Sequence, residues 1–133
     1  MLLPKVAIFL VYQPKGICAS TLRTIRYLTS KGYSTMVVAN GGVSDEHLAE
    51  LTQVSWRVLI RPNYGYDFGG YRDGILSLSE AGITPEKLII LNDSVWFPIG
   101  EDEQVISEIE ASGLDLGGTI VNRRPRRVMP ESW

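Results

Sequence analysis

The sequence predicts an α/β protein: three α/β/α layers, with a mostly parallel, Rossmann-like sheet between helices. Three observations predict this fold. Short apolar runs rich in β-branched and aromatic residues alternate, along 133 residues, with segments whose apolar residues recur at helical spacing. The resulting order, β-α-β-α-β-α-β-α-β, is typical of a parallel sheet with right-handed crossovers. A hydrophobic content of 44% and a net charge of −2 fit a globular domain with its own core.

The strands are expected where apolar runs end in Pro, Gly, Asn or Asp. The expected segments are Lys5–Gln13, Tyr33–Asn40, Val54–Pro62, Thr84–Asp93 (a turn and then a strand) and Leu114–Val121. The first run is too short to span a bilayer. A secretory signal would place positive charge ahead of the run, whereas Lys5 interrupts it, although "GICAS" resembles a weak cleavage site. We therefore interpret this segment as the first buried strand.

The helices are expected between these strands, over residues 20–32, 44–53, 69–82 and 101–113. Ser20 or Thr21 can cap the first helix, and Ser44 can cap the second. Glycines end the first, third and fourth segments, as is common at helix C-termini. The predicted domain covers residues 1–122, and residues 123–133 form a basic C-terminal tail where we expect a longer protein to be cut.

Solitary reactive residues and overall charge exclude several classes of function. Cys18 is the only cysteine and His47 the only histidine, so neither a zinc site nor a Cys–His pair is indicated. We expect Cys18 to be buried and His47 to lie on a helix surface. A lone cysteine favours a reducing compartment. The pI near 5.4 gives no general reason to bind nucleic acid. The cluster "RRPRR" (residues 123–127) can attract phosphates or anionic lipid, or form a solvated tail.

The stretch "RPNYGYDFGGYRDG" (residues 61–74) joins the third strand to the third helix. In parallel sheets ligands bind outside the carboxyl ends of the strands. Glycines at such a turn let backbone amides approach a ligand, while Asn63 and Asp67 can bind a base or sugar and Arg72 a phosphate. The alternative is a tight turn in which Gly65 is left-handed, Asp67 caps the helix and the tyrosines pack.

The stretch "LIILNDSVWFPIG" (residues 88–100) places Asn92, Asp93 and Ser94 at the end of the fourth strand. A carboxylate beside an amide and a hydroxyl can hold a divalent cation that bridges a diphosphate. The alternative is an Asx or Ser turn that leads into a packed apolar loop. The dinucleotide, P-loop and nucleophile-elbow motifs do not occur.

Together the two stretches resemble the rhamnan synthesis protein F family, which is related to glycosyltransferases of the GT-A fold. The family pattern N-x-G-x-D-x-G is met by Asn63, Gly65, Asp67 and Gly69, and the pattern N-D-S-x-x-x-P by Asn92, Asp93, Ser94 and Pro98. The resemblance covers roughly Lys5 to Val121, which includes the "VAIFLVY" and "GGTIV" strands.

This resemblance implies transfer of rhamnose or a related sugar from a dTDP-, UDP- or GDP-linked donor to a glycan or lipid-linked acceptor. The setting would be synthesis of bacterial surface polysaccharide, such as lipopolysaccharide or cell wall, in the cytoplasm at the inner face of the membrane. "NDS" stands where GT-A enzymes carry an acidic motif for Mg²⁺ or Mn²⁺, with Asp93 as its single carboxylate. That departure puts strong metal dependence in doubt. Tyr12 and Asn40, at the ends of the first two strands, are predicted to line the nucleoside pocket. The other predicted donor-binding residues are Asn63, Gly65, Asp67, Arg72, Asn92 and Ser94.

GT-A enzymes usually place the acceptor site and the catalytic base after the fifth strand, so the resemblance implies that this chain holds the nucleotide-binding half. No residue is assigned as the general base. Two other classes stay open. The chain can be a non-catalytic module that binds nucleotide sugar or assembles a polysaccharide-synthesis complex. A flavodoxin-like regulatory domain is the third class, and "YQPKGICAS" lacks the acidic cluster that it would need after its first strand.

Overall fold

The structure is a computed structural model that describes residues 2–100, 103–124 and 127–131. The chain divides into two compact units, Met1–Phe97 and Pro98–Trp133. The first unit contains β1 (Lys5–Val11), α1 (Ala19–Ser30), β2 (Ser34–Asn40), α2 (Asp45–Val54), β3 (Arg57–Arg61), α3 (Tyr66–Glu80) and β4 (Lys87–Asn92). The second contains α4 (Val105–Ala111), β5 (Ile120–Arg124) and β6 (Arg127–Glu131).

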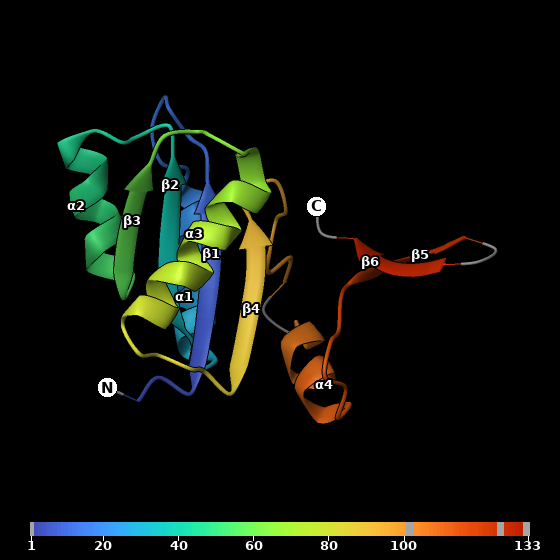
Figure 1. Cartoon of the computed structure of the whole chain (residues 1–133). Helices are drawn as coiled ribbons and strands as arrows, with labels where there is room; N and C mark the ends of the chain where they lie inside the picture. The colour runs from blue at the N-terminus through green and yellow to red at the C-terminus, as the bar shows by residue number, and fades with distance from the viewer. Residues whose placement is uncertain (1, 101–102, 125–126, 132–133) are drawn as a thin grey trace. The chain divides into compact units, whose positions relative to one another are not determined.

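The first unit is a four-stranded parallel sheet in the order β3-β2-β1-β4. Helix α3 covers one face of this sheet, and α1 and α2 cover the other (Figure 1). The predicted α/β fold, with helices on both faces of a parallel sheet, is confirmed. Because β2 and β4 lie on opposite sides of β1, the strand order reverses beside β1. Such a reversal is the usual position of a ligand site in open α/β sheets.

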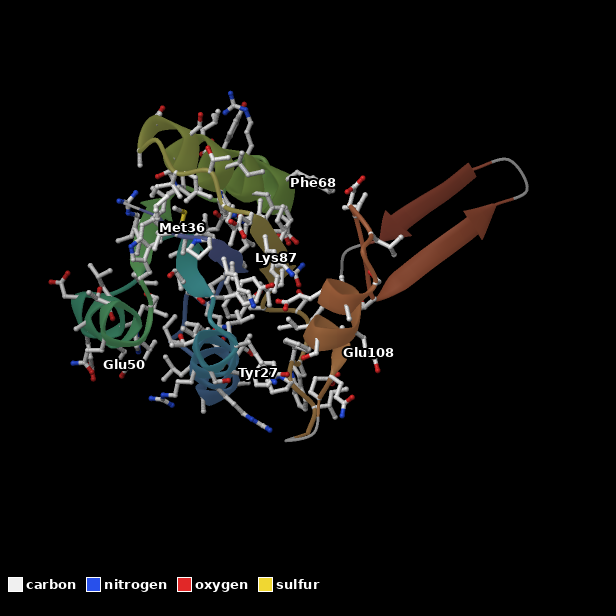
Figure 2. The ribbon with its side chains drawn as sticks, turned by 90° about the horizontal axis from the view of Figure 1, so that it is seen from below. Tyr27, Met36, Glu50, Phe68, Lys87 and Glu108 are labelled. Carbon is white, nitrogen blue, oxygen red and sulfur yellow. The ribbon has the colours of Figure 1, made fainter. Side chains whose placement is uncertain are left out.

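Two apolar clusters hold the helices to the sheet. Val6, Ile8 and Leu10 of β1 pack toward α3 together with Tyr71 and Leu78, whereas Phe9 and Val11 pack on the opposite face with α1 and α2. This alternation follows from the two-residue period of a strand. Figure 2 shows Met36 between the sheet and α3. Since both faces are covered, β1 is apolar from Val6 to Val11 and β2 from Met36 to Ala39, which is why the sequence shows continuous apolar runs there.

Several local predictions are wrong. Helix α1 begins at Ala19 after an N-cap at Cys18, not at Ser20 or Thr21, and Cys18 is exposed rather than buried. Helix α3 begins at Tyr66, three residues before the predicted start, because the glycine-rich stretch forms its first turn. The Ser44 cap of α2 is confirmed, since its side chain accepts a hydrogen bond from the His47 amide.

The fifth strand also differs from the prediction. It runs over Ile120–Arg124 and pairs antiparallel with β6, so it forms a hairpin and does not extend the parallel sheet. Residues 125 and 126 of the arginine cluster lie outside the described residues, as do the side chains of 120–133. The prediction that this cluster contacts anionic lipid therefore stays a prediction. Across the described ranges, no helix has both the length and the apolar character needed to cross a membrane.

Candidate functional site

The candidate site lies at the carboxyl edge of the sheet in the first unit, where β1 and β4 are neighbours. Leu10 of β1 pairs in register with Asn92 of β4, and the Asp93 amide donates to the Leu10 carbonyl at 3.0 Å. The residues that follow each strand, Tyr12 and Asp93, therefore meet across the strand pair. This is the reversal point of the strand order, where the sequence predicts a ligand.

Asp93 is held by donors from the turn after β1. Its Oδ2 accepts hydrogen bonds from the Tyr12 amide at 2.9 Å and from Gln13 Nε2 at 3.0 Å. The Gln13 side chain also donates to Thr21 Oγ1 at 2.7 Å and accepts from the Cys18 amide at 2.7 Å. Gln13 therefore ties the start of α1 to the end of β4. Both hydrogen bonds to Asp93 use the same carboxylate oxygen, so the carboxylate has a fixed orientation and an Oδ1 with no partner among the described residues.

A direct contact joins the two stretches that the sequence singles out. Asn92 Nδ2, at the end of β4, donates to Asp67 Oδ2, in the first turn of α3, at 2.8 Å. Asn92 Oδ1 accepts from the Ser94 amide at 3.2 Å, which fixes the orientation of the amide group. Asn92 is buried and Asp67 is partly buried, so the carboxylate of Asp67 is held at the sheet edge, 25 residues away from its partner in sequence.

The backbone before Asp67 takes an unusual path. Gly65 is left-handed with φ of 72°, and Tyr66 is also left-handed with φ of 49°, a conformation that is costly for a residue with a Cβ. A Cβ at Gly69 would lie 2.5 Å from the Tyr64 carbonyl oxygen, so only glycine fits there. Both features follow from turning the chain sharply from β3 into α3. The predicted left-handed Gly65 is confirmed, whereas Asp67 is not the N-cap of the helix.

Arg61 holds this turn in place. Its guanidinium donates to the Tyr64 carbonyl at 2.6 Å, to Asn40 Oδ1 at 2.9 Å and, through Nε, to Asp73 Oδ2 at 2.8 Å. Its side chain is 9% exposed. Arg61 thus connects the ends of β2 and β3 with α3, and all these contacts are within the protein.

Asn40, at the end of β2, also supports the turn between β3 and α3. Its side-chain amide donates to Asn63 Oδ1 and to the Tyr66 carbonyl, each at 3.2 Å, while its oxygen accepts from Arg61. Asn40 is 1% exposed. The amide therefore stabilises the left-handed backbone at Tyr66 and orients Asn63, which itself is exposed.

Tyr71 lies one helical turn after Asp67. Its ring packs in the core between α3 and the sheet, and its hydroxyl oxygen is buried with no hydrogen-bond partner among the described residues. Burial, followed by the charges of Asp67 and Asp93, raises the pKa of Tyr71 to about 12, while the Asn92 side chain opposes the rise. The phenol is therefore a neutral donor among two carboxylates at neutral pH.

The predicted site residues fall into two groups. Those brought together near Asp93 and Asp67 are Tyr12, Asn92 and Ser94, and those in the turn after β3 are Asn40, Asn63 and Gly65. Arg72 joins neither group: its side chain is 73% exposed, and its Nη1 lies 3.3 Å from Asp73. Exposed aromatic side chains occur in the same loops: Tyr12, Tyr64, Tyr66, Phe68 and Trp96.

Sequence reasoning missed four members of these networks. They are Gln13, Arg61, Tyr71 and Asp73. A signal existed for three of them: an arginine ends an otherwise apolar strand at Arg61, the spacing of Asp67 and Tyr71 places both on one helix face, and Gln13 ends the first predicted strand, where ligand sites are expected. Asp73 carries no comparable signal.

With this geometry in place, comparison with known proteins assigns a family. Rhamnan synthesis protein F matches residues 35–130, which is most of the chain and includes both stretches that meet at the Asp67–Asn92 hydrogen bond. The chain belongs to the rhamnan synthesis protein F family. The expectation drawn from the two motifs is confirmed, and membership associates the chain with polysaccharide synthesis.

A relative from this comparison is similar over nearly the whole chain. The uncharacterized protein y4gN of Sinorhizobium fredii (strain NBRC 101917 / NGR234) is 40% identical over 120 residues, which is 90% of this chain and 31% of that protein. The chain thus spans about a third of the length of this relative. No solved structure matches the chain.

Proposed function

We propose that this chain is the donor-binding portion of a glycosyltransferase of bacterial surface polysaccharide synthesis, and that it binds a nucleotide sugar at the carboxyl edge of the sheet. The observation that carries the proposal is the hydrogen bond between Asn92 and Asp67. It brings both family motifs to the point where the strand order reverses, which is where open α/β sheets bind ligands.

The proposed roles follow from exposure and contacts. Tyr12, Asn63 and Asp67 engage the nucleoside or the sugar, since each has a side chain at least partly accessible at the edge. Asn40, Gly65 and Asn92 position them through the contacts described above. Ser94 lies beside Asp93 near the diphosphate, and Arg72 is a second phosphate candidate because its exposed guanidinium can turn toward an anion.

A divalent cation fits this site only in part. Asp93 is oriented and has an unpartnered Oδ1, which can bind Mg²⁺ or Mn²⁺, and Mg²⁺ often takes one or two carboxylates with the rest of its ligands from phosphate and water. However, the described residues contain no group of three His, Cys, Asp or Glu side chains that could hold a metal. When bound, the cation would neutralise the diphosphate leaving group.

The test is calorimetry of the purified protein with dTDP-rhamnose, UDP-glucose and GDP-mannose, with and without Mg²⁺ or Mn²⁺. We expect one of these donors to bind and both Asp67→Ala and Asp93→Ala to weaken binding about tenfold or more, because hydrogen bonds to charged groups are lost. Glu80→Ala is the matched control, because Glu80 is an exposed carboxylate at the end of α3, the helix that carries Asp67, and it should leave the affinity for the donor unchanged. Absence of binding to all three donors would reject the proposal.

The second candidate is a non-catalytic module that binds nucleotide sugar or assembles a larger synthesis complex. This class stays open because no general base is assigned among the described residues of the site, whose buried polar side chains contact one another. A donor that binds without turnover, measured as release of nucleoside diphosphate with acceptor glycan present, supports the module. Turnover by this chain alone rejects it.

A further inference from the structure

The hydroxyl group of Tyr71 is the one buried polar group of the described edge that the contacts above leave without a use. Tyr71 is 6% exposed, and its ring is fixed in the core on the α3 side of the sheet, where it meets Phe68 edge-on at 6.1 Å between centroids. Its hydroxyl oxygen has no partner with full hydrogen-bond geometry in the described part of the chain, and the Asn92 amide beside it acts as a donor, so the phenol proton has no acceptor. A buried hydroxyl without a partner costs about 1–3 kcal/mol, so such groups usually have a reason.

The surroundings of the hydroxyl indicate the reason. Asp67 and Asp93 are close enough to act on it electrostatically, and the Asn92 amide, which donates to Asp67, also acts on the hydroxyl as a donor. A partner for this hydroxyl must accept a hydrogen bond while it lies next to the Asp67 carboxylate. A phosphate oxygen can only accept and would be repelled by Asp67, whereas a sugar hydroxyl can accept from Tyr71 and donate to Asp67 at once.

We propose that Tyr71 is a ligand-binding residue whose hydroxyl donates to a hydroxyl group of the bound nucleotide sugar, with Asp67 as the acceptor of the same group. This inference rests on the proposed function and names the part of the ligand that the site recognises. The ligand hydroxyl donates to Asp67 Oδ1, so Asn92 keeps its hydrogen bond to Asp67 Oδ2 and no buried amide loses its partner. Because solvent does not reach the Tyr71 hydroxyl, side chains at the edge of the sheet shift when the ligand contacts it. The unpartnered state of Tyr71 thus belongs to the free protein, and binding relieves it.

The decisive variant is Tyr71→Phe, which removes one oxygen and keeps the ring. It should have opposite effects on stability and binding. The thermal midpoint of the free protein should stay the same or rise by about 2–6 °C, because an unpartnered buried hydroxyl is removed. Affinity for the donor that wild type binds among dTDP-rhamnose, UDP-glucose and GDP-mannose should fall about five- to tenfold, the loss expected for one hydrogen bond.

Two comparisons make the result specific. Tyr33→Phe is the matched control, because Tyr33 is also a buried tyrosine but precedes β2, at the opposite edge of the sheet. The Tyr33→Phe variant should bind the donor with the affinity of wild type. Titration with the corresponding nucleoside diphosphate shows which hydroxyl is involved. A loss already seen with the nucleoside diphosphate assigns Tyr71 to the ribose, and a loss seen only with the nucleotide sugar assigns it to the transferred sugar.

Each contrary outcome has a distinct meaning. If wild type binds and Tyr71→Phe binds equally well, the inference is wrong and the proposed function stands. If Tyr71→Phe is less stable than wild type or does not fold, the hydroxyl has a protein partner and the inference is wrong. If wild type binds none of the three donors, the proposed function fails and this inference fails with it.

Discussion

At the scale of single residues, the site depends on polar side chains that are buried and fully engaged. Arg61, Asn40 and Asn92 donate to backbone carbonyls, to side-chain amide oxygens and to carboxylates. These hydrogen bonds shape the surface that Tyr12, Asn63 and Asp67 present. Losing one partner of such a network leaves the others buried without compensation, which is more costly than losing an exposed contact. The residues with the strongest effect on stability are therefore not those expected to contact a ligand.

Arg61 and Arg72 provide a matched test of this difference, since both contact Asp73. Arg61→Ala should lower the free energy of unfolding by about 2–3 kcal/mol, because Asn40, the Tyr64 carbonyl and Asp73 all lose a donor. Arg72→Ala should change it by less than about 0.5 kcal/mol, because exposed ion pairs contribute little. Chemical denaturation of both variants measures this. An equal loss of unfolding free energy in the two variants would contradict the conclusion that Arg61 stabilises the turn between β3 and α3.

The raised pKa of Tyr71 predicts a pH dependence with a definite sign. The folded-state pKa is about 12, above the ordinary value of 10.0, so the folded protein keeps a proton that the unfolded chain loses. This contribution to stability is complete below pH 10 and is lost as the pH rises from 10 to 12. At pH 11 the loss is about 1 kcal/mol. Denaturation of wild type and Tyr71→Phe at pH 9 and pH 11 isolates it, and identical slopes in both proteins would refute it.

At the scale of elements, the turn from β3 into α3 places the site. Helix α3 begins three residues earlier than its apolar spacing indicates, because Gly65 and Tyr66 reverse the chain within two residues and Gly69 allows the Tyr64 carbonyl to approach. As a result Asp67 lies in the first helical turn, where a carboxylate is favoured by the helix dipole, and faces Asn92 of β4.

Gly69→Ala tests this account of the element. Alanine usually stabilises a helix by about 1 kcal/mol relative to glycine, so propensity alone predicts a gain. We expect instead a loss of about 2 kcal/mol or more, because the new Cβ would lie 2.5 Å from the Tyr64 carbonyl oxygen. Ser79→Ala, an exposed position near the end of the same helix, should be stabilising by a few tenths of a kcal/mol. Gly69→Ala with wild-type stability would show that the turn relaxes freely.

At the scale of the whole molecule, the parallel sheet and both apolar clusters belong to one unit of the chain. Every member of the two clusters lies before residue 98. Phe97, the last residue of this unit, contacts α1: its carbonyl accepts a hydrogen bond from Thr24 Oγ1, and its ring centroid lies 5.3 Å from that of Tyr27. The second unit has its own short helix and hairpin. The apolar clusters that support the candidate site therefore consist of residues of the first unit.

A chain shortened to residues 1–97 should accordingly fold. We expect cooperative thermal unfolding with a midpoint within about 5 °C of the 133-residue chain, and the same affinity for any donor that the longer chain binds. Calorimetry of both chains measures the two quantities. A matched chain ending at residue 92, which lacks Asp93 and Phe97, should lose donor binding. An unfolded 1–97 chain would show that the second unit is needed for the core.

The sequence by itself determined the class of fold, the positions of the first four strands along the chain and the two stretches that lie at the carboxyl edge of the sheet. These are set by local patterns: apolar runs buried on two faces, helical spacing, and glycine or polar residues at strand ends. The two motifs also indicated the family, and that prediction is confirmed.

Only the tertiary structure decided which side chains meet. The partners Asp67 and Asn92 are 25 residues apart, Gln13 and Asp93 are 80 apart, and Asn40 and Arg61 are 21 apart, so no local pattern links them. The pairing of the fifth strand likewise depends on the tertiary structure, because periodicity indicates a strand but does not specify its partner. In the structure β5 pairs with β6. The same reason explains Tyr71: its spacing indicates a core residue, but the unpartnered state of its hydroxyl follows only from the strands and carboxylates that the fold places around it.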